Sequence, residues 1–283
     1  MTASTKTEEA IMANWFITGI SRGFGRIMAE ELLARGHTVV GTTRDGRAPT
    51  LHDRLTVFKL DVRDADQARA VLDEAVVTTG GIDVLVNNAG YGLVGAVEEV
   101  SATEAEAVFA TNVIGTHNTI RAILPSMRAR GSGHIVNFSS VGGFAGSVGF
   151  GLYNASKFAV EGLSEALAQE IKPFGIGVTI VEPGYFRTEF LSADSAVKAA
   201  TAIDAYAQSA GQTRRNVSLR NGQQAGDPAK GVQAIIAAVE APEPPLRLPL
   251  GADCIDRMES KIAEVQADIA AWRDTAIATA FDS

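Results

Sequence analysis

The chain has 283 residues, of which 46% are hydrophobic and 20% are charged, as in a soluble globular protein with a sizeable core. Its formal net charge of −8 argues against a nucleic-acid-binding surface, because such surfaces are usually basic. No apolar run approaches the roughly 18 residues of a membrane span, so we expect no membrane partner. Residues 1–13 lack the apolar segment of a secretory signal. We expect them to be an unstructured or cloning-derived lead-in to a single domain at 14–283.

Short apolar runs rich in β-branched and aromatic residues alternate with amphipathic stretches. The runs predict strands buried on both faces at 14–19, 37–43, 54–60, 82–88, 133–140 and 176–184. The stretches between them predict helices at about 25–35, 64–79, 101–130 and 151–173. This alternation indicates an α/β fold, a Rossmann-like doubly wound parallel sheet of about seven strands with helices on both faces.

The pattern changes after Gly184. Residues 188–226 are Ala-rich, polar and weakly periodic, and in a doubly wound fold they would cover the substrate. Asp227 and Pro228 predict the start of a helix, with an N-cap followed by proline at the first helical position. A proline-rich stretch, 241–251, would then deliver a short last strand, and a helical pattern follows from about 252 to 278.

Cysteine and histidine give little sign of metal or disulfide chemistry. Cys254 is the only cysteine, so an intrachain disulfide is impossible, which agrees with a reducing cytoplasmic location. The four histidines are scattered through different elements without metal-ligand spacing. We therefore predict no metal site.

A glycine-rich segment, "TGISRGFG" at 18–25, connects the first strand to the first helix. Glycines at 19, 23 and 25 permit a tight turn and let backbone N–H groups approach a pyrophosphate at the helix N-terminus. The spacing, Gly-x-x-x-Gly-x-Gly, differs from the commoner dinucleotide fingerprint. By itself this segment is compatible with a nucleotide site or with a plain turn.

The stretch "YNASK" places Tyr153 and Lys157 four residues apart with small residues between them. On a helix of about 3.6 residues per turn, these two positions share one face. A phenol has a reference pKa of about 10, and nearby positive charge would favour its phenolate form. The pair is therefore compatible with acid–base chemistry or with ordinary helix packing.

Several motifs occur together in one order: the glycine-rich turn, "NNAG" (87–90), "TNVIGT" around Asn112, "NFSSVGG" (137–143) and "YNASK". In this combination, from about residue 14 to residue 190, the chain resembles a short-chain dehydrogenase/reductase of the shorter, single-domain subdivision. The resemblance implies a catalytic tetrad of Asn112, Ser140, Tyr153 and Lys157. Ser140 is preferred to Ser139 because the family's serine usually lies thirteen positions before its tyrosine.

In such a tetrad Tyr153 exchanges a proton with the substrate oxygen, and Ser140 hydrogen-bonds the same oxygen. Lys157 holds the nicotinamide ribose, and Asn112 supports a water that relays protons to the lysine. The resemblance also implies cofactor contacts, to which Tyr153 and Lys157 contribute along with Gly19, Ser21, Arg22, Gly23, Phe24, Gly25, Arg44, Asp61, Val62, Asn88, Ala89, Gly90, Pro183, Gly184 and Thr188.

The end of the second strand bears on the choice of nicotinamide cofactor. Cofactors without a 2′-phosphate are usually met here by an acidic residue, but this chain has Thr43 followed by Arg44. A guanidinium pairs well with phosphate, and Arg22 adds a second cation. Asp45, one residue later, could instead bond the ribose of NAD(H). We predict NADP(H) in preference to NAD(H).

The sequence thus predicts an NADP(H)-dependent oxidoreductase acting on an apolar carbonyl or secondary alcohol, similar in tone to hydroxysteroid and retinol dehydrogenases. Four aromatic residues flank the site and are compatible with a pocket lining or with core packing, namely Phe144, Phe150, Tyr185 and Phe190. The amphipathic stretches 101–130 and 153–172 correspond to helices that pair subunits in many family members, so a homodimer or homotetramer is expected. Two alternatives remain, a non-catalytic nucleotide sensor and a lyase or epimerase with the same Tyr–Lys pair.

Overall fold

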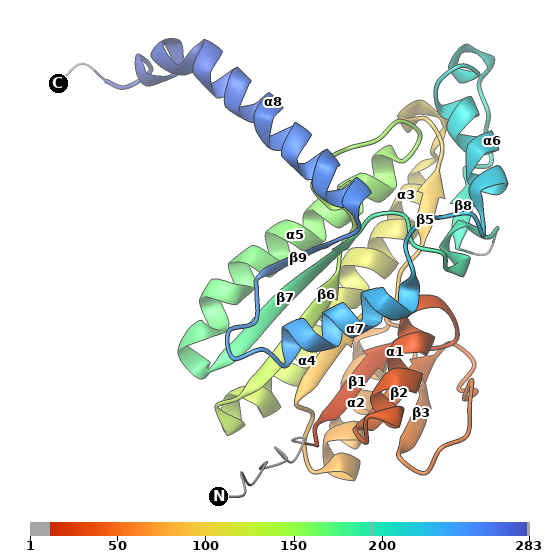
Figure 1. Cartoon of the computed structure of the whole chain (residues 1–283), viewed down its shortest axis with the longest axis vertical. Helices are drawn as coiled ribbons and strands as arrows, with labels where there is room; N and C mark the ends of the chain where they lie inside the picture. Colours follow the sequence, from red (N-terminus) through yellow and green to blue (C-terminus); the bar gives the residue numbers. More distant parts are fainter. Residues whose placement is uncertain (1–11, 194, 282–283) are drawn as a thin grey trace, which may run out of the picture.

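The computed structural model describes residues 12–193 and 195–281, so most of the expected lead-in, residues 1–11, lies outside the described residues. Its centre is a seven-stranded sheet in the order β3-β2-β1-β4-β6-β7-β9, and every neighbouring pair is parallel (Figure 1). The strands are β1 Asn14–Thr18, β2 Thr38–Thr43, β3 Leu55–Lys59, β4 Val84–Asn87, β6 Gly133–Phe138, β7 Ile176–Pro183 and β9 Arg247–Leu250. The predicted doubly wound parallel sheet is confirmed.

Helices cover both faces of this sheet and close two hydrophobic cores. On one face, α1 (Gly23–Ala34) and α7 (Pro228–Val239) pack their apolar sides over the buried side chains of β1. On the other face lie α2 (Ala65–Thr79), α4 (Gly115–Arg130) and α5 (Gly151–Ile171). The central strands are buried on both sides, which explains why they read as continuous apolar runs rather than as alternating ones.

Local signals in the sequence account for several helix boundaries. Asp227 caps α7, since its carboxylate accepts hydrogen bonds from the N–H groups of Ala229 and Lys230 at 2.9 and 3.4 Å. Asp64 caps α2 in the same way. The helix expected over 101–130 is continuous but not uniform, because α3 (Ala102–Phe109) passes through a π-helical turn at Ala110–Ile114 before α4 begins. That turn contains Asn112.

The segment 188–226 is more ordered than its weak periodicity suggested. It contains a 3₁₀ turn at Glu189–Leu191, a short strand β8 (Ala196–Lys198) and a helix α6 (Ala210–Arg220). Strand β8 pairs in parallel with β5 (Gly92–Val94), which directly follows the "NNAG" motif. Three-residue strands carry no periodicity, so sequence reasoning missed both of them.

The last helix, α8 (Ala252–Ile277), begins beside the end of β9 and then runs away from the rest of the molecule (Figure 1). The helical pattern at 252–278 is thus confirmed, with only its first two turns packed. Within the described ranges, no helix combines the length and the apolar character that crossing a membrane requires.

Candidate active site

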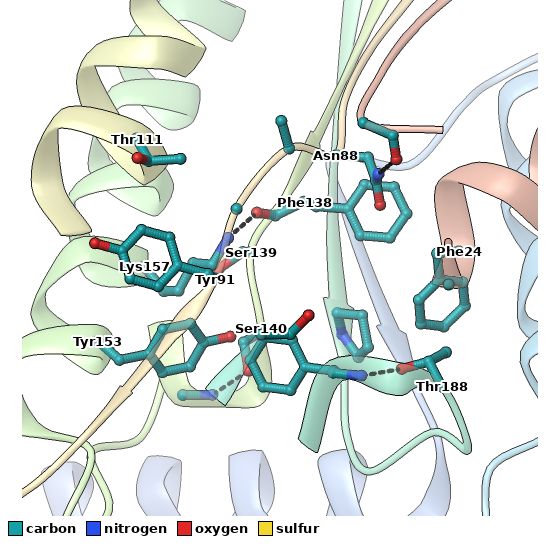
Figure 2. A pocket seen from close by; sticks show the side chains of 18 of the residues that line it. Phe24, Asn88, Tyr91, Thr111, Phe138, Ser139, Ser140, Tyr153, Lys157 and Thr188 are labelled. Carbon is teal, nitrogen blue, oxygen red and sulfur yellow. Dashed lines mark hydrogen bonds between the residues drawn. The ribbon is translucent and has the colours of Figure 1, made fainter. Parts of the chain in front are cut away.

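A cavity of about 610 Å³ lies at the carboxyl edge of the main sheet, where the chain order reverses between β1 and β4 (Figure 2). Doubly wound sheets bind their ligands at this edge. All but two of the predicted site residues line the cavity: Gly19, Ser21, Arg22, Gly23, Phe24, Arg44, Asp61, Val62, Asn88, Ala89, Gly90, Ser140, Tyr153, Lys157, Pro183, Gly184 and Thr188. The two exceptions are Gly25 and Asn112.

The glycine-rich turn enters α1 at the edge of this cavity. Gly19 and Gly23 have φ angles of +74° and +58°, a region that side chains other than glycine rarely adopt. A Cβ atom at Gly25 would lie 2.4 Å from both the Asn88 Nδ2 atom and the Gly19 carbonyl oxygen. Gly25 therefore permits the turn to pack against Asn88 from behind and does not itself face the cavity.

The "NNAG" motif holds this turn in place. The Asn88 side-chain amide donates to the carbonyl oxygens of Thr18 and Gly19, each at 2.9 Å. The backbone N–H groups of Asn88 and Ala89 both donate to the Thr18 hydroxyl at 3.0 Å. The ends of β1 and β4 are thereby fixed to one another on either side of the point where the strand order reverses.

A carboxylate from the far part of the chain lies at the start of α1. The Gly23 N–H donates to a side-chain oxygen of Glu189 at 3.2 Å, across 166 residues of sequence. Helix N-termini attract anions through their free N–H groups and their dipole. The contact shows that this turn offers a donor to an anion, and sequence reasoning missed Glu189 because no local pattern links it to the turn.

Replacing Glu189 by glutamine should strengthen the binding of a phosphate-bearing cofactor, because an entering phosphate would no longer compete with a carboxylate for the Gly23 N–H. We expect the dissociation constant for NADPH to fall roughly twofold to fivefold in Glu189→Gln. Fluorescence titration measures this constant. Glu170→Gln, which removes an exposed carboxylate on α5 away from the cavity, is the matched control and should bind like the wild type.

Tyr153 and Lys157 project side by side from the first turns of α5 into the cavity. Each is only 6% exposed. The Lys157 ammonium donates to the Phe138 carbonyl oxygen at 2.7 Å and lies 6.0 Å from the centroid of the Tyr153 ring. Figure 2 shows this hydrogen bond and the Tyr153 hydroxyl directed toward Ser140.

Burial dominates the protonation of this pair. Loss of hydration raises the pKa of Tyr153 to about 12, although the nearby Ser140 hydroxyl acts in the opposite direction. Loss of hydration also lowers the pKa of Lys157 to about 8. Desolvation thus keeps the phenol protonated although the Lys157 ammonium is nearby, and both groups hold their protons at neutral pH.

The two adjacent serines at the end of β6 differ in their surroundings. The Ser140 hydroxyl faces Tyr153 and accepts a hydrogen bond from the Gly142 N–H at 3.1 Å. The Ser139 hydroxyl is buried without a hydrogen-bond partner, and a Cβ atom at Gly143 would lie 2.3 Å from it. Both serines line the cavity, but it is the Ser140 hydroxyl that the Tyr153 phenol is directed toward (Figure 2).

Asn112 lies behind the cavity wall in the π-helical turn and is 1% exposed. Its side-chain oxygen accepts from the Tyr91 N–H at 3.1 Å, and its amide nitrogen donates to the Tyr91 carbonyl oxygen and the Ser156 hydroxyl, both at 3.0 Å. The amide thus ties the loop after "NNAG" to α5. The backbone carbonyl oxygen of Asn112 accepts a hydrogen bond from the Thr116 hydroxyl. Ser156, which completes this arrangement, was not singled out from the sequence.

The cavity end nearest β2 and β3 carries positive charge. Arg44 lines it, whereas Asp45 does not. The Asp45 carboxylate accepts hydrogen bonds from the Thr43 hydroxyl and the Arg47 N–H, each at 3.1 Å, so it is held in its own turn. The nearby Asp61 is paired with Arg63 at 2.5 Å, and Arg63 is a lining residue that sequence reasoning did not identify.

The opposite end is walled by aromatic side chains. Phe150 and Phe190 pack on the Tyr153 ring with centroid distances of 6.0 and 5.7 Å. Tyr185 also lines the cavity, whereas Phe144 does not. The Phe144 ring instead lies under the Arg247 guanidinium, whose Cζ atom is 5.6 Å from the ring centroid. The Thr188 hydroxyl caps the following 3₁₀ turn by accepting from the Phe190 N–H at 3.3 Å.

Comparison with known proteins agrees with this geometry. Residues 13–199 match the family model for short chain dehydrogenases. The chain is 39% identical to 3-ketodihydrosphingosine reductase from Bacteroides thetaiotaomicron, over 83% of this chain and 86% of that protein. The structure of a short-chain dehydrogenase from Streptomyces avermitilis superposes with a TM-score of 0.88 at 42% identity, covering 95% of this chain and 100% of the other. That of ElxO with NADP bound superposes with a TM-score of 0.71 at 26% identity, covering 87% and 100%. The chain therefore belongs to the short-chain dehydrogenase/reductase family of oxidoreductases.

Proposed function

We propose that this protein transfers hydride between NADP(H) and an apolar carbonyl compound or secondary alcohol, with Tyr153 as the acid or base. The observation that carries the proposal is one continuous cavity. It has a glycine turn and Arg44 at one end, and the buried Tyr153 and Lys157 at the other. The N–H at Gly23, the cation at Arg44 and the two buried protonated groups fit the phosphates and the ribose of a nicotinamide dinucleotide.

When bound, the nicotinamide donates or accepts the hydride. Tyr153 holds its proton at neutral pH, so it suits protonation of a carbonyl oxygen as the electron pair of the hydride reaches the carbonyl carbon. In the reverse direction, the phenol would have to lose its proton first, and a charged Lys157 lowers the cost of that step. Ser140, beside the phenol, would hydrogen-bond the same substrate oxygen.

Lys157 and Asn112 would act behind the reacting atoms. Lys157 is held by the Phe138 carbonyl oxygen and keeps donors for the ribose hydroxyls. Asn112, through Tyr91 and Ser156, fixes the wall against which the lysine lies and supports the proposed relay to it. We propose these roles for the tetrad and, for the lining residues named above, cofactor contact.

The preference for NADP(H) rests on Arg44. Its side chain lines the cavity at the end of β2, and the competing Asp45 is engaged with Thr43 and Arg47. Position 43 is a threonine, so there is no carboxylate there that would repel a 2′-phosphate. These contacts favour NADP(H), which carries the 2′-phosphate, over NAD(H), which does not.

Replacing Arg44 by alanine should weaken NADPH binding by about tenfold or more, the usual range for a lost charge-assisted hydrogen bond. Binding of NADH should change less than threefold or so, since it has no 2′-phosphate. Fluorescence titration with both cofactors separates the two effects. Arg47→Ala is the control, because Arg47 belongs to the same turn and does not line the cavity. Equal losses for NADPH and NADH would contradict the assignment of Arg44.

The substrate end favours an apolar molecule, since Leu93, Phe150, Phe190 and Leu191 face it. The segment 188–226 would cover this end. It is fastened by Arg214, which pairs with the buried Glu99 at 3.0 Å, and by the Tyr206 hydroxyl, which donates to Glu98 at 2.6 Å. A substrate would therefore enter beside a cover that is held in place, and the apolar lining residues would select it by its shape.

The direct test titrates the purified protein with NADPH and NADH and then measures cofactor oxidation with a panel of ketones. Tighter binding of NADPH together with net oxidation would support the proposal. Binding without turnover across the panel would favour a nucleotide sensor, and product isomerisation without net oxidation would favour an epimerase or lyase.

We also propose that the protein forms a homo-oligomer through α4 and α5. Two large apolar side chains face outward here, Ile114 in the π-helical turn that leads into α4, at 49% exposure, and Phe158 on α5, at 45%. Light scattering at micromolar concentration should show at least a dimer. The cytoplasmic location and the division into lead-in and single domain stay predictions.

A further inference from the structure

Helix α8 is the part of the structure least used by the proposed reaction. Only Cys254 and Met258 of its 26 residues are buried, and both belong to its first two turns. Every described residue from 262 to 281 is exposed. At about 1.5 Å per residue, α8 extends for roughly 39 Å, and Figure 1 shows it leaving the body of the molecule.

Apolar side chains follow one stripe along this helix. Beyond the body the stripe consists of four side chains, called the α8 seam here: Ile262, Val265, Ile269 and Trp272, which are 44%, 41%, 56% and 67% exposed. Their spacing of three, four and three residues is the a/d spacing of paired helices. It continues a spacing that begins at Ile255 and Met258.

In the first two turns of α8, the apolar stripe is packed against the rest of the molecule. Met258 lies on the same stripe, is 9% exposed and contacts the buried Cys254. The stripe is therefore covered by the body at Met258, although Ile255 is 44% exposed, and it continues past the edge of the body as the α8 seam. In proteins, most of the stability of a helix comes from packing of its apolar face rather than from helix propensity. The exposed seam consequently calls for a partner.

Charge distinguishes a protein partner from a membrane. Between residues 252 and 277 the helix carries six acidic and three basic residues. Helices that lie on anionic lipid surfaces are usually rich in Lys and Arg on the polar face. The acidic polar face of α8 would be repelled by such a surface in spite of the tryptophan.

We propose that the α8 seam binds the α8 seam of a second copy of this chain, with the two helices antiparallel. In this arrangement Ile262 faces Trp272 of the second copy, and Val265 faces Ile269 of the second copy. Each pair occurs twice, so every seam side chain has an apolar partner. Glu259 and Arg273, each one residue after a seam-type position, then lie opposite one another at both ends. In a parallel pair, by contrast, the main bodies of both copies would lie at the same end of the two helices.

The contact is distinct from the proposed α4–α5 interface and does not depend on the proposed reaction. Eight apolar side chains bury on the order of 800 Å² in total, which is below the roughly 1,200–2,000 Å² of stable specific interfaces and fits a weak association. The α8 contact alone therefore gives a concentration-dependent dimer. Where α4 and α5 already join two chains, it would join two such dimers into a tetramer.

Ile262→Asp combined with Ile269→Asp places charge in the seam and should halve the molar mass measured by light scattering at micromolar concentration. Sedimentation should show the dissociation constant of this step raised at least about a hundredfold. The matched control is Ala263→Asp with Ala270→Asp, which adds the same charge at the same spacing on an outward side. It should keep the wild-type mass. Circular dichroism and NADPH titration establish that both variants are folded, whatever their activity.

Reversing the charges tests the antiparallel arrangement. Glu259→Arg and Arg273→Glu should each weaken association at least about threefold, and the double reversal should restore it. An unchanged mass in the seam variant would overturn the proposal. So would wild-type protein that is monomeric up to about 100 μM, or one that floats with phosphatidylglycerol vesicles through α8.

Discussion

Tyr153→Phe is expected to retain NADPH binding and to lose turnover by a factor of at least about 10³, because it removes the transferable proton but almost no volume. The phenol is buried beside Ser140, at the apolar end of the cavity where the substrate oxygen would lie. Steady-state rates with a reactive ketone, together with fluorescence titration of NADPH, separate chemistry from binding.

Tyr206→Phe is the matched control for this variant. It removes a phenolic hydroxyl that bonds Glu98 outside the cavity, and the Arg214–Glu99 pair still fastens the cover, so its rate should stay within about threefold of the wild type. A near-wild-type rate in Tyr153→Phe would exclude Tyr153 as the acid. Loss of NADPH binding in the same variant would indicate damage to the site rather than to the chemistry.

Arg247→Met is expected to lower the free energy of unfolding by about 3–5 kcal/mol, the cost of breaking a buried ion pair on one side. The Arg247 guanidinium contacts Glu161 and Glu182, each at 2.5 Å, and also contacts Glu165. The Glu182 side chain is 0% exposed and that of Glu161 is 7% exposed, so neither carboxylate could turn to water. Urea unfolding at pH 7 measures the loss.

Arg128→Met is a suitable control because Arg128 also lies over a phenylalanine, Phe174, but on the surface. Its loss should be below about 1 kcal/mol. Adding Glu161→Gln and Glu182→Gln to Arg247→Met should recover much of the stability, since no unpaired charge remains. Equal losses in the two arginine variants would show that the aromatic contact, and not the carboxylates, dominates.

The same cluster predicts a pH dependence. Burial and the neighbouring Glu161 raise the pKa of Glu182 from 4.5 to about 7. The folded state therefore keeps a proton that the unfolded chain releases, and this contribution is full below about pH 4.5 and lost as the pH rises through 7. Without Arg247 the ionised Glu182 carboxylate is unpaired and costs more. The loss of unfolding free energy in Arg247→Met should therefore be smaller at pH 5, where Glu182 is protonated, than at pH 8.

Much of the fold could be predicted from the sequence because its signals are local. Buried parallel strands form apolar runs, and Asp227 with Pro228 marks a helix start whatever the rest of the chain does. The glycine turn and the Tyr153–Lys157 spacing are local in the same sense. Their meeting at one cavity followed from the rule that carboxyl ends of parallel strands share an edge.

What could not be predicted depends on contacts between distant segments. Glu189 reaches Gly23 across 166 residues, and Arg247 meets Glu161 across 86 residues, so no window of sequence contains either pair. The desolvation that raises the pKa of Tyr153 likewise depends on side chains from several elements. The π-helical turn contains Asn112, whose bonds to Tyr91 and Ser156 also join segments that are distant in the sequence.

The small β5–β8 sheet has a consequence for changing specificity by exchange of segments between relatives. Strand β8 belongs to the cover at 188–226, but its pairing partner, β5, lies a hundred residues earlier, and the Gly92 N–H donates to the Ser195 carbonyl oxygen at 2.7 Å. A Cβ atom at Gly92 would lie 3.0 Å from the Phe190 ring. A chimera that imports only a foreign cover would therefore lose the pairing between this cover and β5 of the host, and residues 92–94 must be transplanted with it.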